Sequence, residues 1–106
     1  MIDVTVFRNN RNAFLGFEIK GHADYDEYGK DIVCAGVSTL ATAIINTLDY
    51  YHKKSQFIFT DQQGIMKLEI TNNNNTTDIL MRTFILGIEN IEKNFKEYVK
   101  LHFEEV

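Results

Sequence analysis

Apolar and polar residues alternate along the first twenty positions, which is the period of a β-strand with one buried face. Two such stretches, 2–7 and 13–20, are separated by the asparagine-rich segment 8–12. Asparagine tolerates the left-handed backbone that tight turns require. The pattern therefore predicts a β-hairpin. The apolar residues on one face of its two strands are Ile2, Val4 and Val6, then Leu15, Phe17 and Ile19.

After residue 31 the apolar period lengthens to three and four residues, which is typical of a helix with one buried face. Asp31 is a favourable N-cap because its carboxylate can accept from the first free backbone N–H groups. The helix is expected to run to about His52, with Lys53 and Lys54 near its negative C-terminal end. Its apolar stripe consists of Val33, Val37, Leu40, Ile44, Leu48 and Tyr51, widened by Ile32 and Ile45.

A second hairpin is predicted between residues 56 and 71. Its strands are 56–61 and 64–71, and the polar residues 61–64 are expected to form the turn, since glycine and its polar neighbours suit turn geometry. Along the second of these strands the apolar residues Met66, Leu68 and Ile70 alternate with polar ones.

The last third of the chain predicts a helix and then a strand. Thr76 or Thr77 is expected to cap the helix, which ends near Phe95, and apolar residues alternate again over 98–103. The order ββαββαβ predicts an α+β sandwich, with an antiparallel-rich sheet carrying two helices on one face. The length fits one domain, 1–106.

Charge and composition narrow the functional classes. The net charge is −4 and the basic residues are scattered, so no direct contact with nucleic acid is expected. A mildly acidic surface favours encounter with a basic partner. No stretch approaches the ~20 apolar residues of a membrane span, and the N-terminus does not resemble a signal peptide. A single cysteine excludes an intramolecular disulfide and suits the reducing cytoplasm.

Cys34 and His22 are the candidate reactive pair. Cys34 is the third residue of the predicted helix, where free N–H groups and the helix dipole favour a thiolate and can also receive an oxyanion. His22 lies twelve residues earlier, where the second strand ends. An imidazole there can take the thiol proton and deliver it to a leaving amine. The connecting loop, 21–30, is longer than usual and can act as a lid.

Two further residues are candidate helpers, and plainer interpretations stay open. Ser38 lies one turn after Cys34 and can bind substrate, orient His22, or be only a small residue that lets the sheet approach. Asp31 can orient the imidazole or only cap the helix. Cys34 can also be a small buried hydrophobe, and His22 an ordinary surface histidine. The histidines and Cys34 lack paired ligand spacing, and no phosphate loop exists, so no metal or cofactor is expected.

The run G-H-A at residues 21–23 and the run G-K-D-I-V-C-A-G-V-S at residues 29–38 resemble the ribosomal-processing cysteine protease Prp family. Length and element order extend the likeness over essentially the whole chain. The resemblance implies that Cys34 is the nucleophile and His22 the base, with Asp31 and Ser38 in support. The implied loop residues are the hinges Gly21 and Gly29, and Tyr25 and Tyr28, which can line a slot for an aromatic substrate residue or simply pack in the loop.

The resemblance also implies a substrate and an assembly. Members remove the N-terminal extension, which ends in an aromatic-rich segment, from the precursor of a large-subunit ribosomal protein, and are similar to one another in forming homodimers. The acidic segment ADYDEY would suit a basic substrate. Two other classes are a non-catalytic binding module, in which Cys34 only packs, and a thiol redox sensor, which would need to resolve through a partner.

Overall fold

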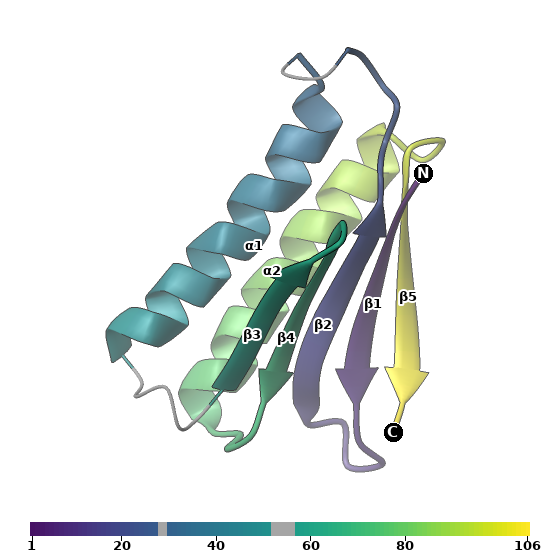
Figure 1. Cartoon of the computed structure of the whole chain (residues 1–106). Coiled ribbons are helices and arrows are strands. Elements are labelled where there is room, and N and C mark those ends of the chain that lie inside the picture. Colours follow the sequence, from purple (N-terminus) through teal and green to yellow (C-terminus); the bar gives the residue numbers. More distant parts are fainter. Residues whose placement is uncertain (28–29, 52–56) are drawn as a thin grey trace.

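The chain folds in the order ββαββαβ that its sequence predicts (Figure 1). The structure is a computed structural model and describes residues 1–27, 30–51 and 57–106. The predicted helix end at His52, with Lys53 and Lys54, and the predicted strand start at residue 56 lie outside these ranges. The elements are β1 Ile2–Arg8, β2 Phe14–Gly21, α1 Ile32–Tyr51, β3 Phe57–Gln62, β4 Ile65–Ile70, α2 Asn75–Asn94 and β5 Val99–Glu105.

The five strands form one mixed sheet in the order β3-β4-β2-β1-β5. Each hairpin is antiparallel, and β2 and β4 join the two hairpins in antiparallel register. The last strand, β5, lies parallel to β1, with Ile2 opposite Val99. Both helices cover the same face of the sheet (Figure 1), so the predicted α+β arrangement is confirmed.

The core lies between the helices and the sheet. Val4 and Val6 of β1 are fully buried, as their alternation predicts. Phe17 of β2 stacks on Phe84 of α2, with ring centroids 4.0 Å apart and planes 10° from parallel. This aromatic pair connects the two layers near the middle of the fold, because β2 is the central strand.

Two predicted details are wrong. Asn74, not Thr76 or Thr77, caps α2, and its side chain accepts from the Thr77 N–H at 3.0 Å while the Thr77 hydroxyl accepts from the Asn74 N–H at 2.8 Å. Thr77 is therefore the partner in a capping box. The second hairpin turn is also tighter than expected, because only Gln63 and Gly64 lie between the strands, with φ of 55° and 77°.

The prediction that no stretch approaches the length and hydropathy of a membrane span is wrong for α1. By length and composition alone it is apolar enough to cross a membrane, with a mean hydropathy of 1.5. The high value arises because residues 32–48 carry no charge and the interrupting residues are small. In the fold α1 is one of the two helices on the sheet, and Val33, Val37 and Leu48 are buried in the core.

Candidate active site

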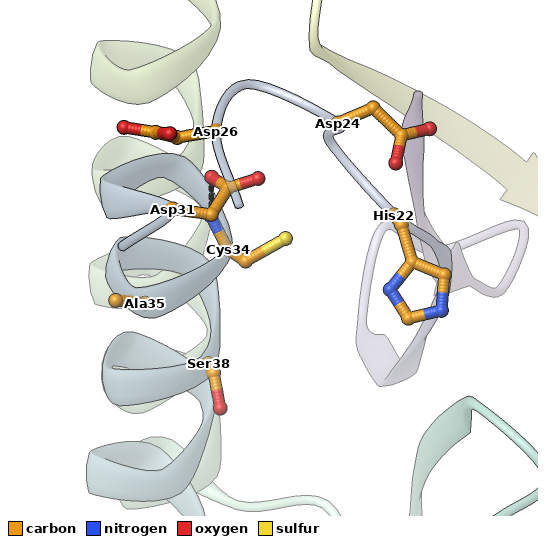
Figure 2. A pocket seen from close by; sticks show the side chains of 7 residues that line it. All are labelled: His22, Asp24, Asp26, Asp31, Cys34, Ala35 and Ser38. Carbon is orange, nitrogen blue, oxygen red and sulfur yellow. Dashed lines mark hydrogen bonds between the residues drawn. The ribbon is translucent and has the colours of Figure 1, made fainter. Parts of the chain in front are cut away.

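A pocket of about 490 Å³ opens where β2 ends and α1 begins (Figure 2). The end of the second strand and the start of the first helix meet here, as the sequence predicts. The pocket contains a thiol, an imidazole, a hydroxyl and three carboxylates, which is enough for acid–base and nucleophilic chemistry. Its lining residues are His22, Asp24, Asp26, Asp31, Cys34, Ala35 and Ser38.

Asp31 caps α1 and also holds the preceding loop. Its Oδ1 atom accepts from the backbone N–H groups of Val33 and Cys34, each at 3.0 Å. Its Oδ2 atom accepts from the Tyr25 N–H at 3.0 Å. The hydrogen bond from the Cys34 N–H is the main cause that lowers the pKa of Asp31 below its usual range, against a desolvation effect that raises it. Both carboxylate oxygens are thus engaged by the backbone, which favours the capping role over the orientation of His22.

Cys34 is half-buried, and its sulfur accepts a hydrogen bond from the Ala23 N–H at 3.4 Å. Burial raises the pKa of the Cys34 thiol, and the negative charges of Asp31 and Asp24 raise it further, whereas the Ala23 N–H lowers it. The sequence predicts that the helix start favours the thiolate, whereas burial and the two carboxylates shift the pKa of the thiol in the opposite direction. The N–H groups of Val33 and Cys34, expected to receive negative charge, are already donated to Asp31.

His22 faces the Cys34 sulfur across the pocket (Figure 2). The imidazole is exposed, and within the described part of the chain no hydrogen bond joins it to the thiol. Catalytic hydrogen bonds of free enzymes often shorten only when substrate binds. The structure thus brings the predicted pair into one pocket, with room between the two groups.

Gly21 fixes the point where the chain leaves β2. Its φ is +93°, and a Cβ atom there would collide with the Met1 carbonyl oxygen. Only glycine combines this backbone angle with such a close approach. Gly21 therefore sets the direction in which the chain leaves β2 and so the position of the His22 backbone. The other predicted hinge, Gly29, lies outside the described residues.

Ser38 lies one turn after Cys34, and its side chain lines the same pocket (Figure 2). It is exposed, and its hydroxyl has no hydrogen-bond partner among residues 1–27, 30–51 and 57–106. The hydroxyl is therefore available to a bound substrate.

Tyr25 lies outside the pocket lining. Its ring packs edge-on against Phe95 and Tyr98, with centroid distances of 5.5 and 5.0 Å, where α2 ends and β5 begins. This contact matches the plainer interpretation of Tyr25 as a packing residue. Tyr28 lies outside the described residues.

Three residues that were not predicted, Asp24, Asp26 and Ala35, also line the pocket, and the Ala23 N–H is a donor to the sulfur that was not predicted either. Asp24 has a left-handed backbone, with φ of 55°, and follows the buried Ala23. In the sequence, Asp24 stands two positions after His22 with the apolar Ala23 between them, and this spacing was a usable signal for Asp24. Nothing in a side-chain pattern signals a backbone donor. Within the described ranges, no group of three or more His, Cys, Asp and Glu side chains is placed to hold a metal ion.

Comparison with known proteins connects this geometry to a family. The profile of the family described as Cysteine protease Prp matches residues 1–100. A Staphylococcus aureus protein named ribosomal processing cysteine protease Prp is 26% identical over 106 residues, which cover 98% of this chain and 100% of the relative. A Bacillus subtilis protein of the same name is 27% identical over 116 residues, which cover 95% and 96%.

Solved structures have the same fold. The crystal structure of the S. aureus protease with a covalently linked product peptide matches with a TM-score of 0.87 at 26% identity, over 98% of this chain and 100% of that one. The structure of SMU.848 from Streptococcus mutans matches with a TM-score of 0.78 at 30% identity, over 100% and 96%. Sequence and fold therefore indicate the same relatives over the full length.

Proposed function

The chain belongs to the cysteine protease Prp family, and on this premise we propose that Cys34 and His22 cut the precursor of a large-subunit ribosomal protein and release its N-terminal extension. The observation that carries this proposal is the pocket in which the Cys34 sulfur faces the His22 imidazole. The names of the relatives, ribosomal processing proteases, support the class of substrate.

The reaction needs only these two side chains and water. His22 takes the thiol proton, and the sulfur bonds to the scissile carbonyl carbon while an electron pair moves to the carbonyl oxygen. Collapse of this intermediate expels the amine, which takes the proton from His22 and leaves a thioester. Water, deprotonated by His22, then attacks the thioester, and Cys34 leaves as the thiolate. The products are a carboxylate and an amine.

The surroundings of Cys34 in the free protein favour the protonated thiol until substrate binds. Burial and the nearby carboxylates raise the pKa of the Cys34 thiol, which favours its protonated form in the free protein. A basic precursor would offset the negative charges of Asp24 and Asp31, which raise the pKa of the Cys34 thiol, and so favour the thiolate. Substrate binding and thiol activation are thereby coupled.

The remaining family features belong to the same proposal. Asp31 holds the loop to the helix, Ser38 offers its hydroxyl to the substrate, and Gly21 and Gly29 are the hinges of the loop. Tyr28 contributes to an aromatic slot. The family resemblance supports a homodimer, and the lone thiol suits the cytoplasm.

Mass spectrometry of a precursor peptide incubated with the protein tests the proposal. We expect wild type to produce one N-terminal fragment, whereas Cys34→Ala and His22→Gln leave the peptide whole or reduce cleavage at least about 100-fold. His102→Gln is the matched control, because His102 pairs with Asp3 at 3.0 Å between β5 and β1, outside the pocket lining.

Full cleavage by Cys34→Ala would overturn the mechanism. Binding of the precursor by wild type without any cut would indicate a binding module. Oxidation that changes partner binding, again without a cut, would indicate a redox sensor.

A further inference from the structure

The Ala23 backbone N–H is aimed at the reactive sulfur. Its nitrogen lies 3.4 Å from the Cys34 Sγ atom. We propose that this N–H is a catalytic donor, which steadies the thiolate and then receives the oxyanion of the tetrahedral intermediate. The inference rests on the proposed function, and it assigns to the loop a role that the sequence analysis gave to the helix.

The first turn of α1 has little left to offer an oxyanion. The N–H groups of Val33 and Cys34 both donate to the Asp31 carboxylate. The Ala35 N–H donates to the Asp31 carbonyl oxygen at 3.1 Å. Donors that are already satisfied do not stabilise new charge without losing a bond. The donor that already contacts the sulfur comes from the other wall of the pocket.

The loop fixes the position of this donor on both sides. Before it, Gly21 ends β2 against the Met1 carbonyl. The Ala23 side chain is only 3% exposed and belongs to the hydrophobic core. After it, the Tyr25 N–H is held by the Asp31 carboxylate. A donor held in this way needs little rearrangement during the reaction, which is the condition for strong oxyanion stabilisation.

The oxyanion forms close enough to the sulfur for the Ala23 N–H to reach it. When Sγ bonds to the carbonyl carbon, the carbonyl electron pair moves to the oxygen, which is then two bonds from the sulfur. An N–H that contacts the thiolate reaches that oxygen by a small shift, as the sulfur becomes neutral and loses its demand for a donor. Collapse returns the electron pair to the carbon–oxygen bond and expels the amine, which takes its proton from His22.

The single cysteine makes an exact chemical test practical. Peptide 1–33 as a thioester can be ligated to 34–106 at the natural Val33–Cys34 junction, with no residue added. Replacing Ala23 by L-lactic acid in the synthetic peptide changes its N–H to an ester oxygen and keeps the methyl group. The matched control places lactic acid at Ala13, whose N–H donates to Asn9 Oδ1 at 3.0 Å in the first hairpin turn.

We expect two effects of the Ala23 ester and neither from the Ala13 ester. The pH profile of Cys34 alkylation by iodoacetamide moves to higher pH, since the lost N–H had lowered the pKa of the thiol. The kcat/KM for precursor cleavage falls by about 100- to 1000-fold, mostly in kcat, as for the loss of one oxyanion-hole donor. A merely structural role would not move the alkylation profile.

The inference would be overturned if the Ala23 ester kept the wild-type pH profile of Cys34 alkylation and the wild-type kcat. It would also be overturned if the Ala13 ester showed the same alkylation shift and the same fall in kcat/KM. If wild type alkylates as expected but cuts no precursor, the proposed function fails while the sulfur contact stands. Should the Ala23 ester not fold, amide NMR of the wild type decides the contact. The Ala23 amide resonance must then titrate with the midpoint of Cys34 alkylation, and a flat resonance contradicts the proposal.

Discussion

At the scale of single residues, the Cys34 thiol is balanced between opposing neighbours. Burial and the carboxylates of Asp31 and Asp24 favour the neutral thiol, and the Ala23 N–H favours the thiolate. Reactive cysteines that stay ionised without substrate are open to oxidation and alkylation. A thiol whose pKa is raised in the free protein is protected until a substrate changes its surroundings.

Asp24→Asn tests this balance. Because it removes a negative charge near the sulfur, it should lower the pKa of the Cys34 thiol and move the alkylation profile to lower pH. The alkylation rate at neutral pH should rise roughly two- to fivefold, since exposed charges are well screened. Asp26→Asn is the control, because Asp26 lines the pocket but is not among the groups that shift this pKa. Equal shifts for both variants would contradict a specific effect of Asp24.

These residues also show what a sequence can predict. The Asp31 cap was predictable, because it depends on neighbours two and three positions away. The direction of the thiol pKa was not predictable, because burial of the sulfur, the main cause that raises it, depends on tertiary packing, and the Asp24 charge and the Ala23 N–H act on Cys34 only through the fold of the loop. The first N–H groups of the helix are not free to stabilise a thiolate, because the Asp31 carboxylate already accepts from two of them.

At the scale of elements, the end of β2 depends on one glycine. Gly21 and Gly64 both have positive φ, at 93° and 77°, but a Cβ at Gly64 would meet nothing within 4 Å. Gly64→Ala should therefore cost only the left-handed strain of an ordinary residue, about 1 kcal/mol in the free energy of unfolding. Gly21→Ala adds a backbone collision in the pairing of β2 with β1 and should cost roughly 2–4 kcal/mol.

Urea unfolding followed by circular dichroism measures both variants. Gly21→Ala should also reduce precursor cleavage under conditions where it is still folded, because His22 follows directly. Equal stability losses for the two variants would show that the contact with Met1 is not restrictive.

The existence of each helix and strand was predictable because periodicity is local. Where an element begins was harder to predict, because several adjacent polar residues can each act as its cap. For α2, the chain offered Asn74, Thr76 and Thr77 as caps. The reciprocal bonds between Asn74 and Thr77 satisfy two backbone N–H groups at once, which a cap at either threonine would forgo. Pairs three residues apart do not single out this start either, because Asn73–Thr76 and Asn75–Asp78 are also polar pairs.

At the scale of the whole molecule, the parallel pairing of β5 with β1 joins the two ends of the chain. Alternation predicts that β5 is a strand but not which neighbour it takes. The pairing matters for the site, because β1 lies between β5 and β2, the strand that delivers His22. The pocket is therefore built on a sheet whose register depends on residues from both ends of the sequence.

Phe17 of β2 and Phe84 of α2 stack across the sheet–helix interface, and both rings are fully buried. Phe84→Ala should cost about 3–5 kcal/mol in the free energy of unfolding, through lost burial and the cavity left behind. A domain of this size has only about 5–15 kcal/mol in total. Leu86→Ala on the same helix is the control: Leu86 is 58% exposed, so its loss should change stability by less than about 0.5 kcal/mol.

Urea midpoints of the two variants, with the denaturant slope compared to wild type, measure these costs. Because α1 and the loop rest on the same core, Phe84→Ala should lose cleavage in proportion to its unfolded fraction, and its folded fraction should keep the wild-type alkylation profile of Cys34. If the pH profile of Cys34 alkylation changed at urea concentrations below the unfolding transition, the pocket would open independently of the core. The contacts that hold the pocket closed would then lie near the start of α1 and not at Phe84.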